Sequence, residues 1–203
     1  APSPAELARM FDSYGALWLF IVLMVSTPGP ANLLIMTAGA QYGFARCIPF
    51  NIGLISGKLL LNVAMAFGLT SIVQQHPEIA KVFAALSAAY MIWLSLRGWN
   101  AHIDTQRPDR ELSFRDGVFV HPLSPKAWVM AVLAFSEFMP ATPTVAEQYL
   151  LIPLSFVLAQ LVFHSSWCLA GVMLRRALGA SKVLNRGLAL LTIAVVLWAL
   201  LLA

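Results

Sequence analysis

Two lysines deep within long uncharged stretches are the residues best placed to do chemistry. Lys58 follows eleven uncharged residues after Arg46 and precedes nineteen more before Glu78, and Lys126 lies ten residues after Asp116. At a helical rise of about 1.5 Å per residue, each lysine lies about 15–18 Å inside its stretch. At that depth in a bilayer a lysine needs a partner or a water-filled cavity, and snorkelling to the interface is the less favoured alternative.

No acidic residue lies at a comparable depth in the sequence. We therefore expect the two lysines to attract an anionic group, such as the carboxylate of a bound solute. The alternative is that desolvation favours the neutral amine.

Polar residues in the same stretch share a helical face with Lys58. Asn51 and Asn62 lie seven and four residues away from it, which places all three on one side of a helix. Gly53 and Gly57 form a GxxxG pattern that favours close packing against another helix. The pattern predicts a polar stripe facing the protein interior.

Prolines interrupt two of the apolar stretches. Pro28-Gly29-Pro30 breaks the first, and Pro122 with Pro125 breaks a later one just before Lys126. A proline within a helix removes a backbone hydrogen bond and clashes with the preceding turn. The freed backbone groups must face protein or water, as they do at substrate sites of transporters. A purely structural kink is the alternative.

Gln160, His164 and Trp167 share one face of a later helix by their spacing. Imidazole changes its charge near neutral pH, so His164, with Gln160 beside it, is a candidate for proton coupling. An interhelical hydrogen bond is the alternative role.

Composition identifies the class of protein that these residues serve. Of 203 residues, 60% are hydrophobic and 11% are charged, whereas soluble domains have about 45–50% and about 25%. This excludes a soluble globular, disordered or DNA-binding protein. We find no P-loop, HExxH, GxSxG or buried carboxylate pair, and Cys47 and Cys168 fit neither a disulfide framework nor a zinc site. We therefore expect no catalytic residues, no metal and no cofactor.

The uncharged stretches predict one all-α transmembrane domain over residues 1–203, because about 20 apolar residues cross a bilayer as a helix. The six expected membrane helices cover approximately residues 14–42, 44–73, 79–99, 116–138, 149–174 and 184–203. Three precede and three follow a basic central loop, and the first of each half is broken by prolines. An odd number of spans per half predicts an inverted 3+3 repeat.

Basic residues are unevenly divided between the two sides of such a bundle. One side carries Arg9 and Lys81. The other carries nine, namely Arg46, Arg97, Arg107, Arg110, Arg115, Arg175, Arg176, Lys182 and Arg186. The positive-inside rule predicts that this basic side is cytoplasmic and that both termini are periplasmic. Binding of anionic lipids is an alternative use of these charges.

These motifs together resemble the LysE/RhtB family of amino-acid exporters over nearly the whole chain. The resemblance rests on Ser26-Thr27-Pro28-Gly29-Pro30, on Gly53 with Gly57, and on Ser124-Pro125-Lys126-Ala127-Trp128. It implies a bacterial inner-membrane secondary transporter that moves amino acids or related metabolites outward, driven by proton motive force. Relatives usually have Asn at the position of Ser124 and often Asp at that of Lys58.

The sequence thus predicts export of a small carboxylate-bearing solute. The expected substrate-binding residues are Lys126, Lys58, Pro28, Gly29, Pro30, Asn32, Asn51, Asn62, Ser124 and Pro125. Expected partners are an amino acid or organic acid and membrane lipids, with a homodimer also considered and no nucleic acid. A passive small-solute channel and a non-transporting assembly or lipid-binding subunit are the alternatives.

Overall fold

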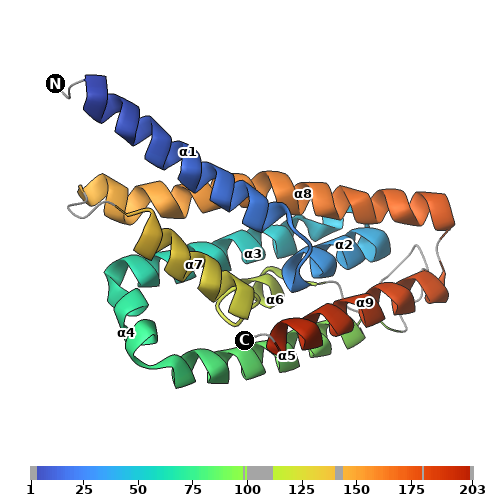
Figure 1. The fold of residues 1–203 in the computed structure, drawn as a ribbon. Coiled ribbons are helices and arrows are strands. Elements are labelled where there is room, and N and C mark those ends of the chain that lie inside the picture. Colours follow the sequence, from blue (N-terminus) through green and yellow to red (C-terminus); the bar gives the residue numbers. More distant parts are fainter. Residues whose placement is uncertain (1–3, 98, 100–111, 140–143, 180, 202–203) are drawn as a thin grey trace.

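All regular structure in the described residues is helical, which confirms the predicted all-α class (Figure 1). The computed structural model describes residues 4–97, 99, 112–139, 144–179 and 181–201. The helices are α1 (Pro4–Ser26), α2 (Pro30–Tyr42), α3 (Phe44–Ala64), α4 (Thr70–Gln75), α5 (Pro77–Arg97), α6 (Phe114–Val118), α7 (Pro125–Glu137), α8 (Ile152–Leu178) and α9 (Lys182–Leu201), with π-helical turns η1 (Met65–Leu69) and η2 (Glu147–Leu151).

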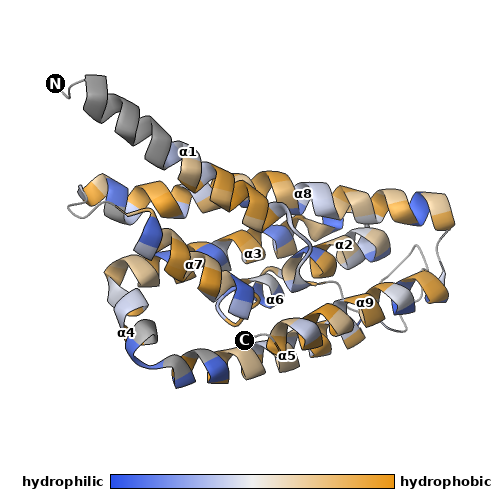
Figure 2. Ribbon diagram, viewed as in Figure 1, coloured by the Kyte–Doolittle hydropathy of each residue, from blue (hydrophilic) through white to orange (hydrophobic). Residues whose placement is uncertain are grey.

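Several of these helices are long and apolar enough to cross a membrane. Three qualify alone, at Phe44–Ile72, Tyr149–Leu178 and Lys182–Leu201, and the bent pair α1–α2 qualifies as a fourth. Figure 2 shows α8 and α9 largely in hydrophobic colours, and leucines on α8 such as Leu154 and Leu158 are half exposed. Outward apolar side chains of this kind are solvated by lipid.

The first helix break lies at the Pro-Gly-Pro motif. α1 ends at Ser26, and α2 begins at Pro30 after an extended Gly29, with the two axes bent by 52°. A proline in the first turn of a helix costs no hydrogen bond because its missing N–H has no partner there. The motif therefore ends one half-helix and starts the next.

The fourth predicted span is broken over a longer segment than its prolines indicated. α6 ends at Val118, and α7 begins at Pro125 with Ser124 as its N-cap residue. Since α7 has 13 residues, it is about 20 Å long and does not cross a bilayer alone. The second predicted span also bends, because Gly68 has a positive φ of 103° between α3 and α4.

Glycines let helices from the two halves of the chain approach closely. A Cβ on Gly53 or Gly57 of α3 would overlap the backbone carbonyls of Phe114 and Val118 in α6. Gly39 of α2 and Gly171 of α8 make the same kind of contact in a second crossing. As a result α2 is the interior helix, with eleven of its 13 residues buried.

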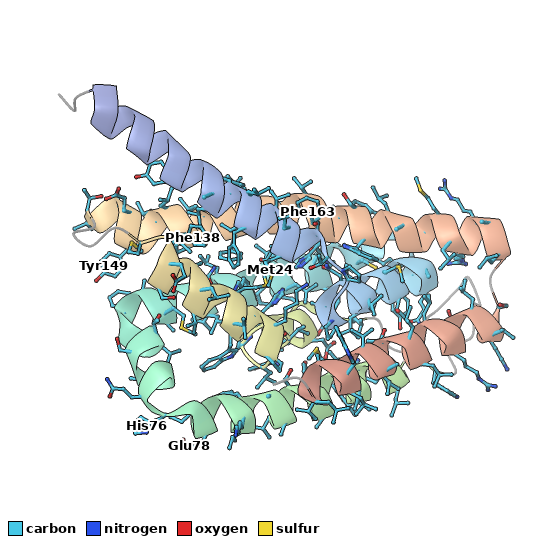
Figure 3. The ribbon with its side chains drawn as sticks, viewed as in Figure 1. Met24, His76, Glu78, Phe138, Tyr149 and Phe163 are labelled. Carbon is cyan, nitrogen blue, oxygen red and sulfur yellow. The ribbon has the colours of Figure 1, made fainter. Side chains whose placement is uncertain are left out.

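An apolar cluster packs α1 against α7 and α8. Phe20 and Phe138 stack with ring centroids 5.2 Å apart, and Met24 and Phe163 pack in the same cluster (Figure 3). This cluster fixes where the end of α1 lies relative to α7 and α8, and therefore where the two helix breaks meet.

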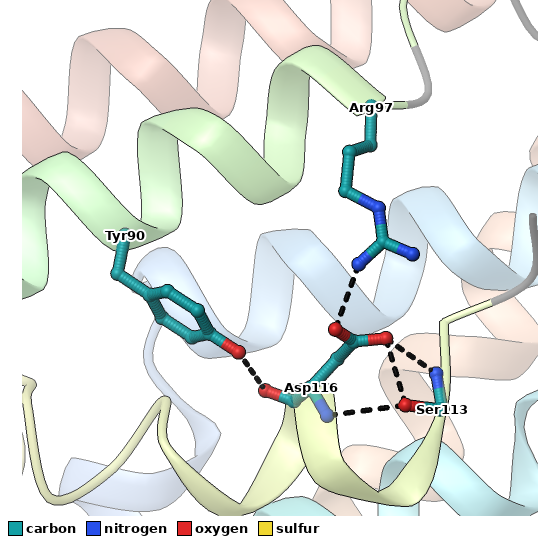
Figure 4. A network of polar contacts seen from close by, with 4 residues as sticks. All are labelled: Tyr90, Arg97, Ser113 and Asp116. Carbon is teal, nitrogen blue, oxygen red and sulfur yellow. Dashed lines mark hydrogen bonds and ion pairs between the residues drawn. The ribbon is translucent and has the colours of Figure 1, made fainter.

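A polar network holds the start of α6 against the end of α5 (Figure 4). Arg97 Nη1 lies 2.7 Å from Asp116 Oδ1, and Tyr90 donates a hydrogen bond of 3.0 Å to the Asp116 carbonyl oxygen. Ser113 and Asp116 form a reciprocal capping box at the N-terminus of α6. Such caps satisfy backbone N–H groups that a helix end leaves free.

Candidate substrate site

A buried pocket lies where the two helix breaks meet, between α3 and α8. Its empty space is about 360 Å³, including its opening to solvent. Of the residues predicted from the sequence, it is lined by Gly29, Pro30, Asn32, Lys58, Ser124, Lys126, Gln160 and His164. These come from four separate stretches of the chain, which the structure therefore brings together.

Lys126 connects the second break to the first. Its Nζ donates to Thr27 Oγ1 at 2.8 Å and to the Thr27 carbonyl oxygen at 3.1 Å. Its side chain passes so close to Gly29 that an added Cβ would lie 3.2 Å from both Cδ and Nζ. Gly29 is therefore needed for the close approach, whereas its extended backbone is available to other residues.

The carbonyl groups freed at the end of α1 are also occupied by side chains. Asn32 Nδ2 donates to the carbonyl oxygens of Val25 and Thr27, each at 2.9 Å. Trp167 Nε1 donates to the Ser26 carbonyl oxygen at 3.2 Å. These bonds stabilise the break, because the last carbonyls of a helix have no partner within it.

Lys58 is fully buried and is paired within the protein. Its Nζ donates to the Ala127 carbonyl oxygen at 2.8 Å and lies 4.3 Å from the centroid of the Phe156 ring. An ammonium over an aromatic face is stabilised by the ring quadrupole. Lys58 of α3 thus holds the first turn of α7 and packs on α8.

His121 is a pocket residue that the sequence analysis did not identify. It lies between α6 and α7, and its ring stacks on His164 with centroids 5.4 Å apart and an interplanar angle of 8°. Gln160 Nε2 lies 3.2 Å from His121 Nε2. The signal was available, since His121 immediately precedes Pro122 in the expected break.

Among the residues that the structure describes, the surroundings of the pocket are electropositive. The first turns of α2 and α7 line it, and the first N–H groups of a helix carry partial positive charge without an intrahelical acceptor. Lys58 and Lys126 add two amines, while none of the lining side chains is acidic. The arrangement is suited to a carboxylate.

Four predicted site residues lie elsewhere. Asn51 donates to Ser165 Oγ at 3.3 Å on α8, and the buried Asn62 amide has no hydrogen-bond partner in the described part of the chain. Pro28 is exposed, and Pro125 faces a smaller pocket bounded by α5 and α9. The expected stripe through Lys58 therefore does not line the pocket along its length, because α3 packs its polar face against both α7 and α8.

Membrane-length helices, two opposed helix breaks and a buried cationic pocket define a membrane transport protein. Residues 21–203 match the family described as LysE type translocator, and the chain belongs to that family. The match confirms the resemblance drawn from the motifs, and it confirms a membrane transporter rather than an enzyme.

Curated relatives resemble most of the chain. A homoserine/homoserine lactone efflux protein of Salmonella typhimurium is 27% identical over 74% of this chain and 78% of its own length. A leucine efflux protein of Enterobacter is 24% identical, covering 87% and 90%. A cysteine/O-acetylserine efflux protein of Salmonella choleraesuis is 28% identical, covering 80% and 84%. No solved structure matches the chain.

Proposed function

We propose that this protein is a bacterial inner-membrane secondary transporter that exports an amino acid or a related small carboxylate-bearing metabolite. The names of the three relatives, all efflux proteins, support this direction and substrate class. The observation that carries the proposal is the meeting of two half-helix N-termini with two lysines at one pocket lined by no acidic side chain.

In this proposal the solute carboxylate binds between the first turns of α2 and α7. The N–H groups of Ala31 and Asn32, which have no acceptor within α2, would donate from one side. An anion at a helix N-terminus gains about 0.3–1 kcal/mol, or up to about 2 when partly buried. Lys126 supplies the ammonium. Lys58 acts from behind α7, keeping its first turn in place through the Ala127 carbonyl.

Binding of the solute would also release the contact that holds the first helix break to α7. Lys126 Nζ reaches Thr27 at the end of α1, so a carboxylate that takes over the ammonium releases this link between α1 and α7. Movement of α1 relative to α2 at Pro28 and Gly29 then opens the pocket to one side of the membrane and closes it to the other. In this proposal proton motive force drives the cycle, with the pocket residue His164 as the proton carrier.

The proposed topology is a single domain of six spans in an inverted 3+3 arrangement, with both termini in the periplasm. In support, α8 ends and α9 begins at the same end of the molecule (Figure 1). There Arg175 donates to the carbonyl oxygens of Ala40 and Gln41 at the end of α2. A membrane-impermeant thiol label should therefore reach Gly179→Cys only from the cytoplasm and Thr144→Cys only from the periplasm; the reverse pattern would invert the assignment.

Export from cells or proteoliposomes tests the function directly. A panel of amino acids and organic acids is measured with and without an uncoupler, and we expect export of a subset that collapses when the proton gradient is removed. Downhill flux indifferent to the uncoupler would show a passive channel. Absence of flux and binding for the whole panel would show a non-transporting subunit.

A further inference from the structure

We propose that His121 and Gln160 form a second subsite of the pocket. This subsite recognises the hydroxyl or amino group next to the solute's carboxylate. The inference rests on the proposed function and specifies its substrates as α-hydroxy or α-amino acids. Both side chains line the same pocket as Lys58 and Lys126. The exposed fractions are 7% for His121 and 1% for Gln160, so both residues are almost completely shielded from solvent.

This buried pair has unused hydrogen-bonding capacity. Gln160 Oε1 and His121 Nδ1 are buried and have no partner in the described part of the chain. A buried polar atom without a partner costs about 1–3 kcal/mol, and such atoms are few in native proteins. Because both residues border the pocket, a bound solute is the natural source of the missing partners.

The donors and acceptors of the pair determine which chemical group fits. When Gln160 Nε2 donates to His121 Nε2, the ring proton is on Nδ1, and the pair offers one donor and one acceptor. Exchanging the amide oxygen and nitrogen reverses these roles and keeps one of each. A hydroxyl can satisfy both, an ammonium can donate to the acceptor, and an alkyl group can satisfy neither.

The pair is held rigidly in the pocket that Lys126 also lines. The parallel stack on His164 fixes the His121 ring, and Gln160 lies one helical turn from Phe156, on which Lys58 packs. A solute bound by its carboxylate in this pocket would therefore present the polar group of its α-carbon to a fixed donor and acceptor.

The test compares acids that share a carbon skeleton and differ only at the α-carbon. One set is L-leucine, L-2-hydroxy-4-methylpentanoate and 4-methylpentanoate, and the other is L-alanine, L-lactate and propionate. Affinity for the full-length purified protein is measured by calorimetry. We expect the wild type to prefer the polar members of at least one set over the alkyl acid by about tenfold or more, as expected when buried polar atoms lose their partners.

Gln160→Leu and His121→Phe should each reduce this preference to less than about threefold. Gln160→Met is a second apolar variant of similar length, used if Gln160→Leu does not fold. The matched control is Ser87→Ala, which removes another buried unpartnered atom outside the pocket and should keep the wild-type preference.

Two results would overturn the subsite. One is equal wild-type affinity for all three members of both sets; the other is an unchanged preference in Gln160→Leu, or Gln160→Met, and His121→Phe. Lysine-dependent binding without α-carbon discrimination would leave the proposed carboxylate site standing and remove only this inference. Failure of every acid to bind, together with absent export, would instead count against the proposed function itself.

Discussion

Lys126 Nζ lies 2.8 Å from Thr27 Oγ1, so the second residue of α7 is bonded to the residue that directly follows α1. The two residues are 99 positions apart in the sequence. This bond places the two helix breaks at a single site, and it is the bond that the proposed carboxylate would displace.

Gly29→Ala should weaken solute binding several-fold with little loss of stability. The added Cβ would lie 3.2 Å from Lys126 Cδ and Nζ, so the lysine must shift, whereas the extended backbone at position 29 accepts alanine. Gly15→Ala in α1 is the control, since its Cβ meets nothing within 4 Å. Calorimetric affinity and thermal midpoint are measured together, and equal effects from both variants would refute the close-approach argument.

Replacing both Pro28 and Pro30 by alanine should abolish export while the protein remains folded. The substitution restores two N–H groups and removes the steric clash with the preceding turn, so a continuous helix becomes accessible. The side-chain bond from Asn32 to Val25 opposes this change, so we expect loss of rate before loss of fold. Pro49→Ala, at a proline inside α3, should transport normally. Wild-type export by the double variant would show that the motif is only a structural kink.

Two substitutions of Lys58 should lower the stability of the protein by different amounts. Lys58→Met keeps most of the side-chain volume and removes the hydrogen bond to the Ala127 carbonyl oxygen. Because hydrogen bonds to charged groups contribute about 1.5–3 kcal/mol, we expect a destabilisation of about that size. Lys58→Asp should be more destabilising, since a buried carboxylate would face that same carbonyl oxygen without a donor. Denaturant unfolding in detergent measures both; an aspartate variant as stable as wild type would mean that Lys58 is not an internal partner of α7.

The hydrogen bonds to Glu147 predict that the folded protein loses stability in acid. Hydrogen bonds from the Tyr14 hydroxyl, at 2.6 Å, and from the Thr144 backbone N–H and hydroxyl lower the pKa of Glu147 below its usual value. A carboxylate with a lowered pKa in the folded state contributes stability above its unfolded pKa and loses that contribution as pH falls through the folded pKa. The thermal midpoint should therefore fall in this acidic range for wild type and change less for Glu147→Gln. Parallel curves for the two proteins would contradict the assignment.

How far the sequence could predict the site depended on whether local rules decide the geometry. Proline chemistry is local, so the break after Ser26 and the start of α7 at Pro125 followed from the motif. The depth of Lys58 was predictable by counting, but its partner is a backbone carbonyl, and a carbonyl has no signature in the sequence. His121 was missed because its importance comes from two residues on α8, about 40 positions later, and Asn62 was included because a shared face does not specify which helix covers it.

Exchange of radiolabelled solute in proteoliposomes, comparing wild type with Lys126→Met at equal reconstitution, tests whether Lys126 binds the solute's carboxylate. The solute is whichever amino or organic acid the wild type exports fastest, and Lys81→Met, at an exposed lysine of α5, is the control. If the pocket binds the carboxylate through Lys126, the methionine variant should elute as a folded protein and lose exchange by at least about tenfold, since hydrogen bonds to charged groups contribute about 1.5–3 kcal/mol. Exchange at the wild-type rate by folded Lys126→Met would contradict the carboxylate site.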